Sequence, residues 1–161
     1  MFEEQQLDPI RHNRKPFCCG EPDLDRFLKQ HAHQNMRLGV SQTFVLVPVE
    51  GPSEIAGFYT LAPAEVTLAD LQSADAKPLP PYPVPCFRMG RLARDQRWRG
   101  GGLGPLLLGL AVQRCLHAKQ SVGGYALVVD AKTPGAGEFY ARHGFRPFQG
   151  RPQSLYLPLG V

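Results

Sequence analysis

The stretch Arg97-Trp98-Arg99-Gly100-Gly101-Gly102-Leu103-Gly104 decides how the rest of this sequence is interpreted. Two arginines lead into it, four of the five residues from 100 to 104 are glycine, and Pro105 opens an apolar run. Glycine lets backbone N–H groups approach a ligand closely. The N-terminus of a helix adds N–H groups without partners and the positive end of its dipole, and proline is tolerated in a first turn. The stretch therefore predicts a pyrophosphate-binding loop, with Arg97 and Arg99 supplying charge.

The spacing of this stretch differs from that of the common nucleotide-binding loops. Leu103-Gly104 stands where a Walker loop has Lys-Ser or Lys-Thr, and no G-x-G-x-x-G string is present. The pattern that remains is Arg-x-x-Gly-x-Gly, formed by Arg97, Gly100 and Gly102. The plainer interpretation is a glycine-rich turn between a strand and a helix.

Size and composition favour one globular domain over residues 1–161, with a net charge of +4 and a pI near 9.0. A basic balance favours RNA or a phosphorylated cofactor, although a mildly basic protein without such a partner fits equally well. Neither a signal peptide nor a membrane span is expected. The four cysteines form no C-x-x-C pair, which indicates reduced thiols in a cytoplasm. His31 and His33 would diverge on a helix, so no metal is expected.

The periodicity of the chain predicts an α+β domain built on a mixed sheet. Residues 1–22 look polar and irregular, and a helix is expected over 22–37, with Leu24, Phe27, Leu28, His31 and Asn35 at helical spacing. Strands are expected over 43–49 and 54–61 as an antiparallel hairpin, and over 86–93, 125–129, 145–147 and 154–159. A mostly buried helix is expected over 106–117 and a further helix over 134–143, closed by Gly144.

The glycine loop, together with Asp130, Phe139-Tyr140 and Gly144-Phe145 at their distances from it, resembles the GCN5-related N-acetyltransferase (GNAT) family. The match runs from about residue 86 to 148. It implies the GNAT fold, a mixed and mostly antiparallel twisted sheet flanked by helices, with acetyl-CoA as co-substrate and no metal. The positions that the resemblance assigns to acetyl-CoA are Leu92, Ala93, Arg94, Arg97, Trp98, Arg99, Gly100, Gly101, Gly102, Leu103, Gly104, Pro105, Asp130 and Phe139.

A narrower resemblance spans almost the whole chain. The segments that carry it are residues 17–20 (FCCG), 25–28 (DRFL), 57–61 (GFYTL), 81–85 (PYPVP), 90–93 (GRLA) and 126–131 (ALVVDA). They are similar to the acetyltransferase toxins of type II toxin–antitoxin systems, of the TacT and AtaT type. This implies the α-amine of an aminoacyl-tRNA as acceptor, a homodimer, and a ribbon-helix-helix antitoxin as partner. Gly101 departs from the long polar residue frequent there, which removes a side chain but no backbone donor.

Acetyl transfer to an amine requires a polarised carbonyl, a neutral amine and a protonated leaving thiolate. A backbone N–H near Leu92 would act as the oxyanion donor, and the ammonium group of an aminoacyl ester is acidic enough to need no strong base. Tyr140 is the predicted general acid; the alternative is a core aromatic, for which Phe139 is the better candidate. Cys86 and Cys115 lie in apolar segments and are expected to be buried and structural.

Basic residues on several segments are the candidates for contacts to tRNA phosphates. These are Lys29, Arg37, Arg88, Arg91 and Arg142. The favoured function is an acetyl-CoA-dependent N-acetyltransferase toxin that acetylates the α-amino group of aminoacyl-tRNA and inhibits translation. The alternatives are a housekeeping acetyltransferase for a small amine or a protein N-terminus, and a non-catalytic CoA- or RNA-binding module.

Overall fold

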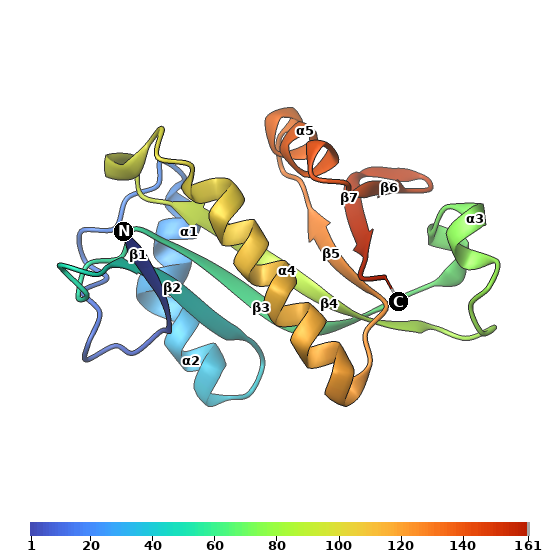
Figure 1. The fold of residues 1–161 in the computed structure, drawn as a ribbon, viewed down its shortest axis with the longest axis horizontal. Helices are drawn as coiled ribbons and strands as arrows, with labels where there is room; N and C mark the ends of the chain where they lie inside the picture. Colours follow the sequence, from blue (N-terminus) through green and yellow to red (C-terminus); the bar gives the residue numbers. More distant parts are fainter. Residues whose placement is uncertain (161) are drawn as a thin grey trace. The chain divides into compact units, whose positions relative to one another are not determined.

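A computed structural model describes residues 1–160 of the chain (Figure 1). Its strands form one seven-stranded sheet in the order β1-β2-β3-β4-β5-β7-β6. The pairs β1–β2, β2–β3, β5–β7 and β6–β7 are antiparallel, whereas β4–β5 is parallel. The sheet is therefore mixed and mostly antiparallel, and the predicted α+β class is confirmed.

The strands are β1 (Phe2–Gln6), β2 (Gln42–Pro48), β3 (Gly57–Val66), β4 (Val84–Arg94), β5 (Ala126–Asp130), β6 (Arg146–Phe148) and β7 (Arg151–Pro158). The helical segments are α1 (Pro22–Arg26), η1 (Phe27–His31), α2 (Ala32–Arg37), η2 (Leu68–Asp70), α3 (Ser73–Ala76), η3 (Gln96–Trp98), α4 (Leu103–Val122) and α5 (Pro134–Arg142). By its contacts the chain divides into two compact units. The first holds residues 1–62 and 90–111, and the second holds residues 63–89 and those from 112 onward.

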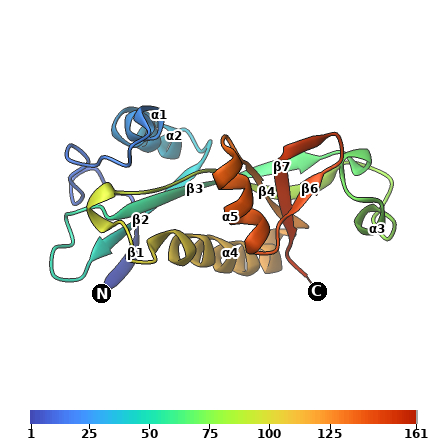
Figure 2. The same cartoon turned by 90° about the horizontal axis from the view of Figure 1, so that it is seen from above.

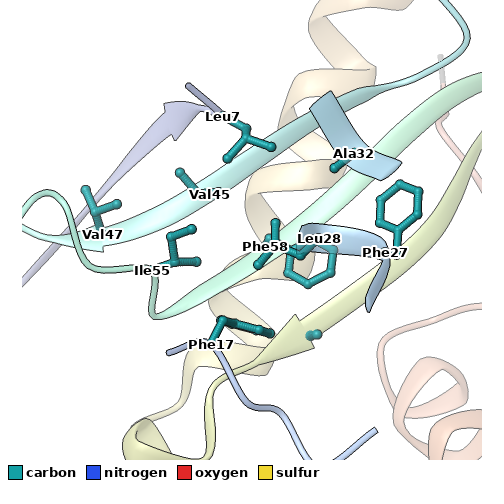
Figure 3. Close-up of a cluster of buried hydrophobic side chains, with 10 residues drawn as sticks. Leu7, Phe17, Phe27, Leu28, Ala32, Val45, Val47, Ile55 and Phe58 are labelled. Carbon is teal, nitrogen blue, oxygen red and sulfur yellow. The ribbon is translucent and has the colours of Figure 1, made fainter. Parts of the chain in front are cut away.

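In the first unit, helices cover both faces of β2 and β3. The segments α1 and α2 lie on one face and the first half of α4 on the other (Figure 2). Phe17, Phe27, Leu28 and Phe58 are buried between the α1–α2 segment and the strands (Figure 3). On the opposite face α4 packs so closely that a Cβ added at Gly57 would lie 2.7 Å from the Leu107 side chain. The glycine at the start of β3 thus lets α4 lie directly on the sheet.

The helix expected over 22–37 is present, but its middle turn is a π-helix, η1. Each π turn takes more residues than an α turn because its hydrogen bonds run from i to i+5. His31, expected on the apolar face, is exposed, and Ala32 is fully buried in its place. The wider turn therefore changes which residue returns to the core.

Strand β1 was not predicted, because its sequence FEEQQ has neither the alternation nor the β-branched residues of a strand. Its polar side chains are held by polar partners from later segments. The Tyr59 hydroxyl donates to Glu4, and the His12 ring lies 2.8 Å from the Gln5 side-chain oxygen. Five backbone pairs with β2, from Phe2 opposite Pro48 to Gln6 opposite Phe44, complete the strand.

Helix α4 is longer than expected, at 20 residues, and only one of its faces is buried. Leu103, Leu107, Ala111 and Cys115 recur every four residues and are buried. Leu106 (41% exposed) and Leu116 (40% exposed) lie outside this stripe, so the expectation of a mostly buried helix was wrong. A helix that lies on one sheet needs only a single apolar stripe. Within residues 1–160 no helix is long and apolar enough to cross a bilayer.

The second unit has its own core, and the segment that connects β3 to β4 is held against it by hydrogen bonds and an ion pair. Residues from β3, β4, β5, β6 and β7 form the core with the 67–79 region; they include Val66, Leu71, Val84, Cys86, Ala126, Val128, Phe148 and Tyr156. The Tyr156 hydroxyl donates to Asp75 and accepts the Gln72 N–H, 2.9 Å away. Asp75 also pairs with Arg146. These contacts hold the expected proline-rich connection, which carries only η2 and α3 as regular structure.

Candidate active site

The glycine loop has the backbone conformation that its sequence predicts. Gly100 and Gly102 have φ angles of 81° and 74°, in the left-handed region that L side chains rarely adopt. Helix α4 begins at Leu103 immediately after them, with Pro105 in its first turn (Figure 1). A Cβ added at either glycine would meet no atom within 4 Å, so the space beside both α-carbons is open.

Several N–H groups of this loop have no acceptor within the described part of the chain. The N–H groups of Trp98 and Gly101 are used inside the loop, by Asp95 O at 3.0 Å and Trp98 O at 3.2 Å. Those of Gly100 and Gly102 bond to no residue among 1–160, and the first N–H groups of α4 have no intrahelical partner. The loop thus presents free backbone N–H groups, with no side chain at its glycines, at the positive end of a helix dipole. This arrangement suits a phosphate or pyrophosphate group.

Asp95 fixes the start of the loop, and the sequence interpretation missed it. Its side chain accepts the Arg97 N–H at 2.9 Å and the Cys18 N–H at 3.1 Å, and the residue is 1% exposed. The Gln96 N–H in turn donates to Cys18 O at 2.9 Å, so the loop is tied to the segment before α1. Burial opposes ionisation of Asp95, but the bonds from Arg97 and Cys18 outweigh it and hold its pKa below the usual range. An aspartate at the N-cap of a short turn was the signal that could have revealed this role.

Arg97 is engaged by two carboxylates rather than left free. Its guanidinium lies 3.1 Å from Asp95 and 2.6 Å from Glu54, and these contacts, led by the bond to Asp95, raise its pKa. Arg97 therefore positions the loop, while its predicted contact to a pyrophosphate stays a prediction. Arg99 is exposed and makes no ion pair within residues 1–160, so its charge is available to a ligand.

Strand β4 is paired with β5 over a short length only. The parallel register covers Phe87 opposite Leu127 and Arg88 opposite Val128, and the later residues of β4 have no partner on β5. Leu92, the predicted oxyanion donor, and Ala93 lie on this continuation of β4. The Nε atom of Arg94 is buried without a hydrogen-bond partner in the described chain, as is Trp98 Nε1 in the loop.

The predicted acid Tyr140 is buried on α5 in the second unit. It is 9% exposed, and burial raises its pKa to about 12. Its ring lies 5.2 Å from that of Phe145. The Tyr140 hydroxyl makes no hydrogen bond within residues 1–160, and its oxygen is not completely buried. At neutral pH Tyr140 is therefore protonated, and its hydroxyl has no competing acceptor.

The expectation that Phe139 would be the more buried neighbour was wrong. Phe139 is half-buried, and its ring lies 4.7 Å from the His143 ring one turn later. Tyr140 instead takes the buried position, because α5 turns that side toward Phe145 and the sheet. The burial of Tyr140 is thus compatible with a core role as well as a catalytic one, and its function stays a prediction.

Asp130 and Arg88, assigned separately to acetyl-CoA and to tRNA, are ion-paired with each other. The Arg88 guanidinium lies 2.7 Å from the Asp130 carboxylate, which also accepts the Ser154 hydroxyl at 2.7 Å. The pair joins the end of β5 to β4 and β7. Both assignments stay predictions, and a ligand at either residue would have to share or replace this contact.

The cysteines that were expected to be structural are buried. Cys86 is 3% exposed and Cys115 is fully buried, and burial raises the pKa of their thiols to about 11 and about 12. A thiol with so high a pKa is a poor nucleophile at neutral pH. The expectation that these two cysteines are structural is therefore supported. Residues 1–160 contain no group of three side chains suited to a metal ion.

The residues predicted to contact tRNA have different surroundings. Lys29 and Arg37 are exposed on the α1–α2 segment, and Arg142 is exposed at the end of α5. Arg91 lies 3.8 Å above the centre of the Phe27 ring, and burial lowers its pKa. With Arg88 paired to Asp130, three of the five predicted cations are both exposed and unpaired within the described chain.

Known proteins resemble this chain over nearly its whole length. The probable toxin TacT of Sinorhizobium fredii is 29% identical over 98% of this chain and 91% of its own. The tRNA-acetylating toxin of Mycobacterium tuberculosis is 36% identical over 88% of this chain and 82% of its own. The structure of AtaT complexed with acetyl-methionyl-tRNAfMet superposes with a TM-score of 0.91 at 27% identity, covering 98% of this chain and 95% of AtaT. A tyrosine-to-phenylalanine mutant of KacT gives the same TM-score and identity. No family model matches the chain.

The sheet, the glycine loop at the start of α4 and these likenesses define a GCN5-related N-acetyltransferase. Within that class, the chain belongs to the family of tRNA-acetylating toxins.

Proposed function

We propose that this protein is a toxin that transfers an acetyl group from acetyl-CoA to the α-amino group of an aminoacyl-tRNA and so inhibits translation. The observation that carries the proposal is the likeness to AtaT in complex with acetyl-methionyl-tRNAfMet, which extends over 98% of this chain. An AtaTR structure bound with acetyl-CoA supports the donor, and antitoxin-bound AtaT supports an antitoxin as partner.

The glycine loop is suited to the pyrophosphate of acetyl-CoA. The N–H groups of Gly100 and Gly102 and those of the first turn of α4 would bind its oxygens, because these groups have no acceptor of their own in the described chain. Asp95 and Arg97 would hold the loop in this conformation, and Arg99 would add charge. The other residues predicted at the co-substrate, among them Leu92, Arg94, Asp130 and Phe139, are part of the same proposal.

Tyr140 would supply the proton for the leaving sulfur. The amine attacks the thioester carbonyl, the C–N bond forms, and the C–S bond breaks as sulfur takes the phenolic proton. The proton that the amine loses then restores the phenol, so the products are the amide and the free thiol. A phenol with a pKa of about 12 stays protonated at neutral pH and can act as this donor. The leaving thiolate has a conjugate-acid pKa of about 8.5, below that of the phenol, so donation to sulfur must be coupled to the return of a proton to the phenol from the acylated nitrogen, and the net transfer runs from nitrogen to sulfur.

We also infer a homodimer, a ribbon-helix-helix antitoxin and a cytoplasmic location, where charged tRNA is found. The two compact units would act as one domain, because β3, β4 and α4 run through both. These inferences rest on the resemblance to the toxins and on chain continuity.

Turnover of acetyl-CoA with different acceptors tests the proposed reaction. Charged tRNA should support turnover, and deacylated tRNA should not, because it lacks the amine. Turnover with small amines or N-terminal peptides alone would favour the housekeeping acetyltransferase instead. No turnover with any acceptor would leave the non-catalytic binding module.

A further inference from the structure

Two neighbouring hollows in the first unit have basic side chains in their lining. One, of about 570 Å³, is lined by Pro9, His12, Asn13, Arg14, Lys15 and Lys29. The other, of about 660 Å³, shares Pro9, and its lining includes Arg11, Arg37 and the carboxylate Asp8. We call the five cations Arg11, Arg14, Lys15, Lys29 and Arg37 the basic strip. Lys29 and Arg37 were predicted from the sequence, whereas the other three come from a segment that looked irregular.

The cations of the basic strip form no salt bridge in the described chain, unlike five arginines elsewhere. Elsewhere the ion pairs Arg26–Asp23, Arg88–Asp130, Arg97–Asp95, Arg146–Asp75 and Arg151–Asp70 are formed. Within residues 1–160 no member of the strip forms such a pair. Arg14 makes a single side-chain bond, from Nη1 to the Lys29 carbonyl at 3.3 Å, which ties the 9–15 segment to the helix and leaves its charge unneutralised.

Two carboxylates of the described chain lie near the strip, and neither forms a salt bridge with it. Asp8 accepts the backbone N–H groups of Ile10 and Arg11 at 2.9 and 3.3 Å, and these bonds, together with the nearby charge of Arg11, lower its pKa. Glu54, whose backbone bridges to Asn13, is paired with Arg97 at 2.6 Å. Asp8 therefore offsets part of the charge at Arg11, and Arg14, Lys15, Lys29 and Arg37 keep a net positive charge that favours an anionic ligand.

The turn that carries Arg11, Arg14 and Lys15 is held by hydrogen bonds to β1 and to the 51–54 turn. His12 is 2% exposed, its Nδ1 accepts the Asp8 N–H at 2.9 Å, and its Nε2 lies 2.8 Å from the Gln5 side-chain oxygen. The backbone N–H of Asn13 donates to Ser53 O at 2.7 Å. Cations on a rigid turn lose less conformational entropy on binding than cations on a flexible tail.

We infer that the basic strip binds the sugar–phosphate backbone of the tRNA substrate, with Arg11, Arg14 and Lys15 as contacts additional to Lys29 and Arg37. The inference rests on the proposed function. RNA is the favoured partner because unpaired cations spread over two adjoining hollows match a chain of regularly spaced phosphates. Such contacts position the substrate without selecting its amino acid.

Binding of deacylated tRNA, followed by fluorescence anisotropy over a series of salt concentrations, tests the strip without requiring catalysis. The test variant is Arg11→Gln/Lys15→Gln, because neither side chain makes a hydrogen bond within the described chain. The control is Arg26→Gln, which removes a cation from the adjoining helix that is already paired with Asp23 at 2.9 Å. Thermal melting of each protein checks that the fold is intact.

The double variant should bind tRNA at least tenfold more weakly at moderate salt. Its slope of log affinity against log salt should be smaller by about 2, since each lost phosphate contact contributes roughly 0.9. The control should keep the wild-type slope. In acetyl-transfer assays the variant should show a raised KM for charged tRNA, with an unchanged KM for acetyl-CoA and an unchanged kcat.

If the double variant binds tRNA with wild-type affinity and a wild-type salt slope, the inference is overturned. The same holds if the variant keeps its tRNA affinity but binds an acidic peptide more weakly than the wild type does, because the strip would then be a protein-binding surface. An equal loss in Arg26→Gln would also overturn it, because net charge alone would then explain the effect. Failure of the proposed function is a separate result: the wild-type protein would not acetylate charged tRNA, whatever its affinity for deacylated tRNA.

Discussion

The glycine loop and Tyr140 would serve one reaction through different parts of the chain. The loop acts through backbone N–H groups, in a conformation that requires positive φ at Gly100 and Gly102. Tyr140 acts through a single hydroxyl on a buried ring that is also part of the second unit's core. Because the two groups act in different ways, substitutions should separate a loss of acetyl-CoA binding from a loss of turnover rate. Damage to the loop should change affinity for acetyl-CoA, and removal of the hydroxyl should change only the chemical step.

The largest effect is expected from Gly102→Val, which should abolish detectable acetyl-CoA binding. A β-branched residue resists the φ of 74° that this position requires, and its side chain would enter the open space beside the loop. Isothermal titration calorimetry on the folded variant measures the affinity. Gly109→Val, at an exposed position of α4 with no atom near its added Cβ, is the matched control. Wild-type affinity in Gly102→Val would mean that the loop is only a turn.

Tyr140→Phe should lower kcat by about a hundredfold or more, the scale of a lost general acid. The dissociation constant of acetyl-CoA should hardly change, because the proton is needed in the transition state and not in the bound ground state. Steady-state acetylation assays measure kcat, and calorimetry on the same preparation measures the dissociation constant of acetyl-CoA. A lower melting temperature with a normal rate would instead identify Tyr140 as a purely structural aromatic residue.

Asp95→Asn should weaken acetyl-CoA binding about tenfold and destabilise the fold by roughly 1.5–3 kcal/mol, the range for hydrogen bonds to a charged group. The variant leaves Arg97 with Glu54 alone and weakens the bond to the Cys18 N–H. Calorimetry and thermal melting measure both effects. Glu54→Gln, which removes the more exposed partner of Arg97, should show a smaller change in each. Equal effects of the two variants would contradict the central position given to Asp95.

The smallest effect concerns stability in mild acid, away from both the loop and Tyr140. Burial lowers the pKa of His12 below its usual 6.5, and its Nδ1 must stay unprotonated to accept the Asp8 N–H. A depressed pKa contributes stability that is present above about pH 6.5 and lost as the pH falls through the folded-state value. The loss should be on the order of 1 kcal/mol, as for one buried hydrogen bond. Urea unfolding between pH 7 and 5 (about the titration range of histidine) measures the free energy of unfolding. In His12→Gln this decrease of stability with falling pH should be absent.

Local sequence signals predicted the elements whose causes are local. The glycines of the loop, the helix after it and the helix that ends before Gly144 all depend on residues within a few positions, and each is present. The helix over 22–37 was also predicted, although its π turn was not. Local patterns therefore predicted the conformation of the glycine loop and the helix that carries Tyr140, the candidate acid.

The features that sequence did not predict depend on distant partners. Asp95 acquires its role from Cys18, 77 residues earlier, and β1 is held through Tyr59, 55 residues later. The pairing of Arg88 with Asp130 likewise needs two strands to be adjacent. The burial order of Phe139 and Tyr140 was reversed because it depends on how α5 faces its neighbours. The ion-pair partner of a side chain and its burial depend on residues that are distant in sequence, so local sequence patterns do not predict them.

Mass spectrometry of the aminoacyl groups on total charged tRNA tests directly whether this protein acetylates aminoacyl-tRNA. The tRNA would be incubated with the protein and isotopically labelled acetyl-CoA, and the aminoacyl groups released by mild base. We expect a labelled acetyl group on the α-nitrogen of one or more amino acids, and we expect none when Tyr140→Phe replaces the wild type in a short incubation. Unmodified aminoacyl groups, from an enzyme that still consumes acetyl-CoA with free amines, would contradict it.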